Sequence, residues 1–281
     1  MQTYALLTLD IDGTLLDPVG AIPPANLAAL RGWLGQPGRN LALATGRNLT
    51  ITRPIASAIY GAVGRSFYLI LQDGCLLLRF PDLTVLQYRN LPLPLAQTAC
   101  ELFRQARQAV ILFDPLPEGQ GFKLVEHGPL PGGVRRYIAA KNGQYARWPS
   151  AQALTEAPSK IVTLDTPERV MILSNQLQDR LPQARILQTE AVRLNAWFLE
   201  VGPAQASKLA ALQALTRHLG LDLGAVMAIG DAENDLEMIR AAGLGLAMGN
   251  ASERVKQAAD QIIGSNAEAG VAQFLARNGG V

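Results

Sequence analysis

The chain has 281 residues, 49% of them hydrophobic, and a net charge of only +2, so it can form a sizeable core and has no excess of basic charge. Its scattered Lys and Arg residues lack the charge pattern of a nucleic-acid-binding protein, and no apolar run approaches the length that crosses a membrane. Cys75 and Cys100 are too few for a disulfide framework or a zinc cluster and are expected to be buried thiols. The start of the chain lacks a signal-peptide pattern, so we expect a cytoplasmic protein, and the length predicts two domains or one domain with a large insertion.

The first third of the chain alternates buried strands with helices. Apolar runs predict strands over residues 6–9, 41–44 and 67–71, and the spacing of leucines predicts a helix over 27–34. A second helix is expected to run to about Ile59, interrupted near its start by Pro54. This order is typical of a parallel sheet whose strands are joined by right-handed crossovers.

The middle of the chain loses this strict alternation. Short strand-like runs at 110–113, 121–125 and 160–164 mix with helical patterns at 96–107 and 168–181, and a stretch rich in Pro and Gly at 115–133 is expected to form loops and turns. The mixture favours an antiparallel α+β unit inserted into the parallel one. We therefore predict a core domain of residues 1–84 and 190–281 and an inserted domain of residues 85–189.

The last third returns to the alternating pattern. A strand beginning at Val192 is expected to lead back to the core, followed by a helix that starts near Lys208 and ends before Gly220. Strands are predicted over 225–229 and 244–248, with a helix through Ile239 between them and a final short helix over 269–275. Because a cation is unfavourable in the first turn of a helix, Lys208 requires a nearby anion or must point into solvent.

Polar, glycine-containing turns follow the predicted parallel strands, and such strand ends meet at one edge of a sheet, where ligands bind. Two carboxylates at positions i and i+2 of an extended segment point to the same face, and paired anions repel unless a cation or proton lies between them. The collected carboxylates, hydroxyl, amides and lysine predict an oxygen-ligand site for Mg²⁺ facing a phosphate, and they do not suit zinc. The turns are Asp10-Ile11-Asp12-Gly13-Thr14, Thr45-Gly46-Arg47, Asp73-Gly74, Gly230-Asp231 and Gly249-Asn250.

Four motifs resemble, in order, those of haloacid dehalogenase-like phosphotransferases: DIDGT at Asp10–Thr14, TGR at Thr45–Arg47, Lys208 at a helix start, and GDAEND at Gly230–Asp235. The later MGNA at 248–251 and SNAEAGV at 265–271 are similar to Cof-type sugar-phosphate phosphatases. The resemblance implies an α/β fold, with a Rossmann-like three-layer core around a parallel sheet and an inserted α+β cap domain that closes over the crevice and selects the leaving group.

The resemblance also implies a role for each motif. Asp10 would be the nucleophile that forms an aspartyl-phosphate, and Asp12 would protonate the leaving oxygen and then activate water. Thr45 and Lys208 would bind oxygens of the transferring phosphoryl group. Mg²⁺ would be held by Asp10, the backbone carbonyl of Asp12 and Asp231, with Asp235 behind these ligands. The remaining substrate-binding residues would be Gly46, Arg47, Asp73, Gly74 and Asn234.

Two positions depart from the pattern of the resembling family, and a third has two interpretations. Asp73 stands where Cof-type relatives place Asn, and an ionised Asp facing the phosphate would repel it unless it turns away, is neutralised, or meets a hydroxyl donor of the leaving group. Leu209 follows the lysine where Gly is common, which would narrow the pocket wall. Arg47 is expected either to reach the substrate or to form a surface ion pair.

The predicted function is Mg²⁺-dependent hydrolysis of a small phosphate ester, such as a sugar phosphate, by a monomer or small homo-oligomer that binds neither nucleic acid nor membrane. A phosphomutase of the phosphomannomutase type would share the aspartyl-phosphate, so the core motifs do not separate the two. A catalytically idle regulator that binds a phosphometabolite is the alternative from another class, and intact Asp10 and Asp12 argue against it.

Overall fold

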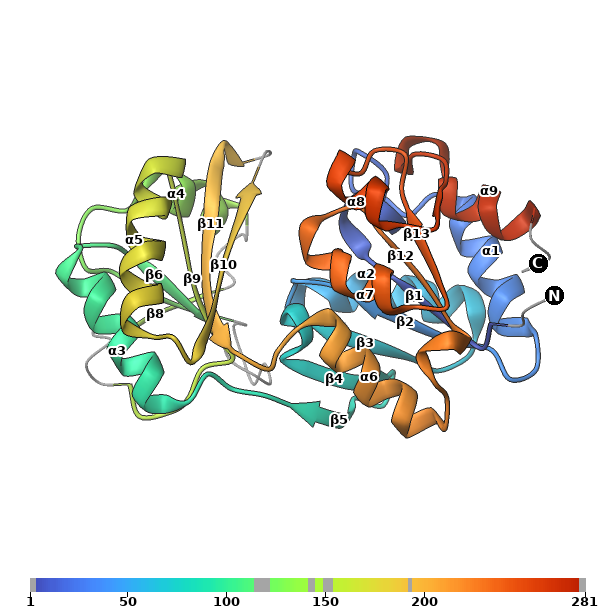
Figure 1. Ribbon diagram of the computed structural model, residues 1–281, viewed down its shortest axis with the longest axis horizontal. Coiled ribbons are helices and arrows are strands. Elements are labelled where there is room, and N and C mark those ends of the chain that lie inside the picture. Colours follow the sequence, from blue (N-terminus) through green and yellow to red (C-terminus); the bar gives the residue numbers. More distant parts are fainter. Residues whose placement is uncertain (1–3, 114–121, 141–144, 149–153, 192–193, 278–281) are drawn as a thin grey trace. The chain divides into compact units, whose positions relative to one another are not determined.

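The computed structural model describes residues 4–113, 122–140, 145–148, 154–191 and 194–277. It divides the chain into two compact units: a core unit, Met1–Tyr88 and Ser207–Val281, and a cap unit, Arg89–Ala206 (Figure 1). The prediction of an α/β core interrupted by an inserted α+β domain is therefore confirmed. None of the helices in these ranges is long and apolar enough to cross a lipid bilayer.

The core unit contains an eight-stranded sheet in which β1 (Leu6–Leu9) is central. The chain extends the sheet on one side of β1 and later on the other, so a topological switch point lies between β1 and β12. The first six strands in the order below are parallel, and β4 and β5 continue the sheet as antiparallel strands. The order is β14 (Gln261–Ile262), β13 (Leu244–Ala247), β12 (Val226–Gly230), β1, β2 (Asn40–Ala44), β3 (Phe67–Leu71), β4 (Leu76–Phe80) and β5 (Thr84–Tyr88).

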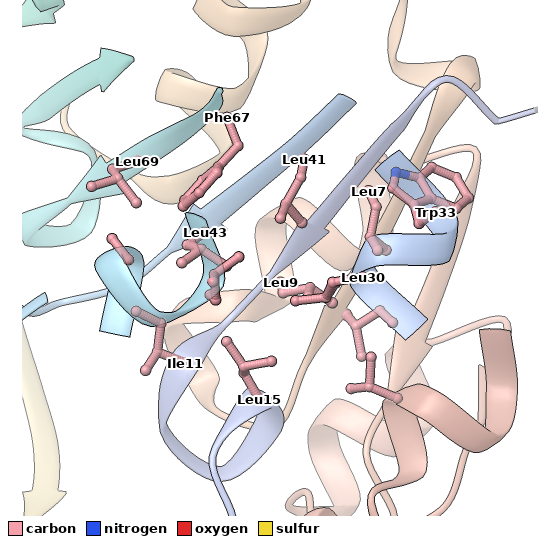
Figure 2. Close-up of a cluster of buried hydrophobic side chains, with 14 of the residues drawn as sticks. Leu7, Leu9, Ile11, Leu15, Leu30, Trp33, Leu41, Leu43, Phe67 and Leu69 are labelled. Carbon is pink, nitrogen blue, oxygen red and sulfur yellow. The ribbon is translucent and has the colours of Figure 1, made fainter. Parts of the chain in front are cut away.

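Helices cover both faces of this sheet because successive strand residues point to opposite sides. Leu7, Leu9, Leu41 and Leu43 pack with Trp33 in a cluster that includes residues of α1 (Pro24–Gly35), α2 (Leu49–Val63) and α9 (Gly270–Arg277) (Figure 2). The alternate positions pack with α6 (Lys208–Leu219) and α7 (Leu236–Ala241) on the other face, and α8 (Glu253–Ala258) lies between β13 and β14 in the chain. Each fully buried leucine contributes about 2 kcal/mol, so the register of the strands is strongly fixed.

The cap unit is a six-stranded sheet with helices on both faces. Cluster residues of α3 (Leu93–Gln105) and α5 (Pro167–Arg180) pack on one face, and Val134 of α4 (Gly132–Ala139) packs on the other. Neighbouring strands are antiparallel except for the parallel pair β7 and β8. The order is β10 (Ala184–Ala191), β11 (Ala196–Pro203), β9 (Lys160–Asp165), β6 (Val110–Phe113), β7 (Phe122–Val125) and β8 (Ala146–Trp148).

The boundaries of the units differ from the predicted ones. The division falls at 88/89 because the hairpin of β4 and β5 extends the core sheet, and at 206/207 because β11 belongs to the cap. The strand expected to return to the core from Val192 instead pairs as β11 with β9 and β10, and Val192 itself lies outside the described residues. Alternating polarity in this segment suits an antiparallel sheet, whereas the strands beside β1 are apolar except for Asn40 at the start of β2.

The helix expected to be interrupted by Pro54 is continuous from Leu49 to Val63. Asn48 caps its first turn by accepting a hydrogen bond from the backbone N–H of Ile51, and Ala56 and Ile59 bury its inner face. Packing of this face outweighs the loss of one backbone hydrogen bond at the proline. The two cysteines are buried free thiols, as predicted.

Candidate active site

The ends of the parallel strands place the predicted motifs side by side. Leu9 of β1 is level with Leu43 of β2 and with Ile229 of β12. The residues that follow these three strand ends are therefore neighbours: Asp10, Thr45 and Asp231. The register of the core sheet thus brings together three motifs that are far apart in the sequence.

A tight turn carries Asp10 and Asp12. Ile11 and Leu15 anchor the turn in the core cluster, and the backbone N–H of Leu16 closes it by donating to the carbonyl oxygen of Ile11 (Figure 2). Gly13 has φ +77°, and a Cβ added there would lie 2.2 Å from Oδ2 of Asp231. Only glycine fits this position, because any side chain would displace the Asp231 carboxylate.

Lys208 is buried between two carboxylates. Its Nζ lies 2.6 Å from Oδ1 of Asp10 and 2.7 Å from Oδ1 of Asp235, and only 1% of its side chain is exposed. Burial lowers the pKa of Lys208, but the charges of Asp10 and Asp235 outweigh burial and raise this pKa above its ordinary value. Of the two possibilities for a lysine in the first turn of α6, a nearby anion or a side chain pointing into solvent, the structure shows the first.

The turn after β12 fixes Asp235 and Asp231 in different ways. Asp235 is fully buried, and its Oδ2 accepts hydrogen bonds from the backbone N–H groups of Asp231 and Ala232, both at 3.1 Å. Oδ1 of Asp231 accepts a hydrogen bond from the Thr14 hydroxyl at 2.9 Å. The carboxylate of Asp231 is thereby held beside the turn that carries the predicted nucleophile.

The carboxylates of Asp10, Asp231 and Asp235 form one acidic cluster, in which one oxygen of each lies within 4.8 Å of the others. Burial raises the pKa of Asp10 well above its ordinary value despite the opposing effect of Lys208. Burial, followed by the charge of Asp235, raises the pKa of Asp231 to about 7. Three such anions with one lysine need a further proton or cation, and an all-oxygen donor set fits a hard divalent cation such as Mg²⁺.

The turn after β2 places Thr45 and Arg47 at the same edge. Thr45 is buried, and its Oγ1 accepts a hydrogen bond from the backbone N–H of Arg47 at 3.1 Å. The Arg47 guanidinium holds Asp12 with two hydrogen bonds, Nε to Oδ2 at 2.7 Å and Nη2 to Oδ1 at 2.5 Å. Of the two roles considered for Arg47, the structure shows an ion pair, and this pair involves the predicted acid–base residue, whose side chain is 54% exposed.

Asp73 turns toward Asn234, whose Nδ2 donates a hydrogen bond to Oδ1 of Asp73 at 2.9 Å. The backbone of Asp73 has φ +55°, a left-handed conformation that Asp and Asn adopt more readily than most residues. Gly74 follows at φ +93°, and a Cβ there would lie 2.1 Å from the carbonyl oxygen of Ser207, the residue before Lys208. Gly74 therefore lets the turn after β3 touch the start of α6.

Three asparagines hold the turn that carries Asp10 and Asp12. No role was predicted for their side chains from the sequence. The side-chain amides of Asn250, Asn26 and Asn266 donate to the carbonyl oxygens of Gly13, Leu15 and Leu16 at 2.9, 3.0 and 2.8 Å, respectively. Their second contacts tie the turn to the C-terminal segment: Oδ1 of Asn250 accepts from the backbone N–H of Asn266, and Oδ1 of Asn26 accepts from that of Ala272. We call these three residues the asparagine clasp. The MGNA and SNAEAGV motifs contain two of them, but sequence patterns do not show which carbonyl a remote amide meets.

The fold and this arrangement define a class. The chain belongs to the haloacid dehalogenase-like hydrolase family, whose profile matches residues 7–275. The HMP-PP phosphatase of Yersinia enterocolitica is 31% identical over 280 residues, which cover 97% of this chain and 94% of that protein. The chloroplastic endoribonuclease YBEY of Arabidopsis thaliana is 29% identical over 285 residues, covering 98% of this chain but only 46% of that longer protein.

Solved structures agree with this class. A haloacid dehalogenase-like hydrolase from Bacteroides thetaiotaomicron matches with a TM-score of 0.84 and 27% identity, covering 98% of this chain and 100% of that one. A subclass IIB sugar phosphatase of the same superfamily matches with a TM-score of 0.77 and 21% identity over 98% of this chain and 99% of that one, which shows a shared fold. The relatives of this chain thus include phosphatases of the haloacid dehalogenase type.

Proposed function

We propose that this protein is a Mg²⁺-dependent phosphatase that hydrolyses a small phosphomonoester through an aspartyl-phosphate on Asp10. The observation that carries the proposal is the buried contact of Asp10 with Lys208, inside a cluster that also contains Asp231 and Asp235. A salt bridge that only stabilised the fold would gain nothing from two further carboxylates, because their mutual repulsion opposes burial.

The proposed reaction has two steps, and Asp10 and Asp12 act in both. A carboxylate oxygen of Asp10 bonds to phosphorus while the bond from phosphorus to the ester oxygen breaks, and Asp12 gives the leaving oxygen a proton. Water then attacks the aspartyl-phosphate and transfers a proton to Asp12, which releases inorganic phosphate and restores Asp10. The exposed carboxylate of Asp12 suits this exchange with substrate and water, and Arg47 fixes its direction.

Lys208 and Thr45 would stabilise the transferring phosphoryl group. Nζ of Lys208 contacts the oxygen of Asp10 that would be bonded to phosphorus or lie beside it, so its positive charge lies where negative charge develops. Thr45 is buried and held by the turn it belongs to, which fixes its hydroxyl. Gly46 and Gly74 would contribute their backbone to this edge, since the space where their side chains would begin is taken by Asp73 and by the carbonyl oxygen of Ser207, respectively.

Asp10 and Asp231 would bind the metal directly, together with the backbone carbonyl of Asp12. Asp235 would stand behind them, since both of its oxygens already accept hydrogen bonds. Bound Mg²⁺ would supply positive charge that offsets the repulsion between these carboxylates and a phosphate dianion. We infer the substrate class, a small phosphate ester, from the names of two relatives: one is an HMP-PP phosphatase and the other is a sugar phosphatase.

The direct test is phosphate release from p-nitrophenyl phosphate and from a panel of sugar phosphates with Mg²⁺ present. We expect turnover by the wild type, and a loss of at least about a thousandfold in Asp10→Asn, because the neutral amide is not a nucleophile. The matched control is Asp179→Asn, the same change at an exposed position of α5. Near wild-type turnover by Asp10→Asn would contradict the mechanism. Formation of an isomerised sugar phosphate in place of inorganic phosphate would identify a phosphomutase.

A further inference from the structure

The turns that form the candidate site carry more negative than positive charge. Lys208 is engaged by Asp10 and Asp235, and Arg47 is engaged by Asp12. Two further carboxylates, Asp73 and Asp231, bond to the neutral groups of Asn234 and Thr14. Counted as fully ionised, these five carboxylates and two cations have a formal net charge of −3, of which one Mg²⁺ would offset two.

Asp73 lies against the turn that would bind the phosphoryl group. Its backbone N–H donates to the carbonyl oxygen of Thr45 at 3.1 Å, and a Cβ built on Gly46 would lie 3.0 Å from its Oδ2. The Asp73 carboxylate therefore faces Gly46, whose neighbours are the two predicted substrate-binding residues Thr45 and Arg47.

The carboxylate of Asp73 is also held in place. It is 8% exposed, its hydrogen bond to Asn234 fixes one oxygen, and the close contact of Gly74 with the carbonyl oxygen of Ser207 fixes the turn. The charge of Asp73 also reaches the centre of the site. Burial lowers the pKa of Lys208, and the charges of Asp10, Asp235 and Asp73, in that order, raise it. A fixed anion cannot rotate away to accommodate a second anion on the substrate.

We propose that Asp73 is a specificity-determining residue: it favours phosphomonoesters whose leaving group is neutral and rich in hydroxyl groups, or cationic, and it rejects leaving groups that carry a carboxylate or a second phosphate. This inference rests on the proposed function and names its substrate class. The physical basis is Coulomb repulsion, which at an effective dielectric constant of about 20 and a separation of about 8–10 Å disfavours a second anion about tenfold or more.

The test compares two substrates that differ in one group. Glycerol 3-phosphate and 3-phosphoglycerate have the same phosphoester, but the second carries a carboxylate where the first carries a hydroxymethyl group. In Asp73→Asn, the ratio of kcat/KM for phosphoglycerate to kcat/KM for glycerol phosphate is expected to rise about tenfold. Asparagine keeps the shape, an acceptor oxygen for Asn234 and tolerance of positive φ, so thermal unfolding should confirm an intact fold.

The control is Asp179→Asn, which makes the same change in net charge at an exposed cap position and should leave the ratio within twofold of wild type. An unchanged or lower ratio in Asp73→Asn would overturn the inference. Calorimetric binding of the same two compounds with Mg²⁺ gives a second readout that needs no turnover. If the wild type hydrolyses neither compound, and also neither p-nitrophenyl phosphate nor any sugar phosphate of the panel, the proposed function fails, while the ratio of the two dissociation constants still supports or refutes the role of Asp73.

Discussion

Each unit of the molecule contains a buried lysine that contacts a carboxylate. In the cap, Nζ of Lys160 lies 2.5 Å from Oε2 of Glu200 on the neighbouring strand β11. In the core, Lys208 lies between Asp10 and Asp235, with Asp231 in the same cluster. Among the described residues, a group of three carboxylates close enough to hold one metal ion is found only in the core.

This difference separates a structural ion pair from a candidate site. An ion pair that only stabilises the fold must counter the cost of desolvation, and carboxylates packed beside one another add repulsion to that cost. In the core cluster, burial, followed by the charge of Asp235, raises the pKa of Asp231 to about 7, which favours a bound proton until a cation replaces it. The gathering of three carboxylates, and not burial of a lysine, therefore marks the core cluster as the candidate site.

The largest expected effect comes from exchanging each lysine for methionine. Lys208→Met removes the cation beside Asp10, and we expect phosphate release to fall about a thousandfold, because one lost group that stabilises the transition state costs about 10² to 10³ in rate. Lys160→Met removes the ammonium group beside the partly buried Glu200, so unfolding should become easier by up to about 3 kcal/mol while kcat changes little. Both variants should be assayed for phosphate release and for unfolding by a chemical denaturant. If Lys160→Met folds but has no turnover, the proposed difference between the two lysines is contradicted.

A second prediction concerns pH and metal. Because the folded-state pKa of Asp231 is about 7 and its ordinary value is 3.8, the metal-free protein binds more protons when folded than when unfolded between these values. Its stability therefore falls as pH rises from about 4 to 7. Mg²⁺ replaces the proton, so the increase in Tm on adding Mg²⁺ should be larger at pH 8 than at pH 5.

The matched variant for this titration is Asp231→Asn, which should remove most of the pH dependence of the Mg²⁺ effect. Equal increases in Tm at the two pH values for the wild type would contradict the assignment of Asp231 to the metal.

The smallest predicted effect concerns the asparagine clasp of the core. Asn250→Ala leaves the carbonyl of Gly13 without its amide donor, and we expect kcat to fall about tenfold with little change in KM. Asn175→Ala, on the exposed side of α5, is the control and should leave both constants unchanged. If Asn250→Ala lowers Tm but not kcat, the clasp stabilises the fold without positioning the turn.

The two regions also differ in how well the sequence predicts them. The core strands β1, β2, β3, β12 and β13 were predictable because they are short, continuous apolar runs that end in glycine-containing turns, and β1 was predicted with its observed bounds, Leu6–Leu9. Strands β4, β5 and β14 of the same sheet were not predicted. Strand β11 was predicted to return to the core instead of joining the cap, because its alternating polarity shows an antiparallel strand but not which sheet it joins. The pairing of a strand depends on distant partners that its own residues do not specify.

The prediction of the candidate site from the sequence has the same limit, because it too depends on contacts between distant residues. The position of Lys208 at a helix start left two possibilities, a nearby anion or a side chain pointing into solvent, and did not say which anion would be involved. The motifs left open the direction of Asp73 and the partner of Arg47, because both depend on turns that meet only in three dimensions. The contacts of Asp73 with Asn234 and of Arg47 with Asp12 settle where these side chains point.

The most direct test of the central claim is to trap the phosphorylated nucleophile. Borohydride reduces an aspartyl-phosphate to homoserine, so wild-type protein reacted with substrate and Mg²⁺ and then quenched with borohydride should show that mass change at position 10. The same peptide from protein without substrate, and from Asp10→Asn, should be unmodified. Turnover by the wild type with no modification at position 10, or with modification of another carboxylate, would contradict the account.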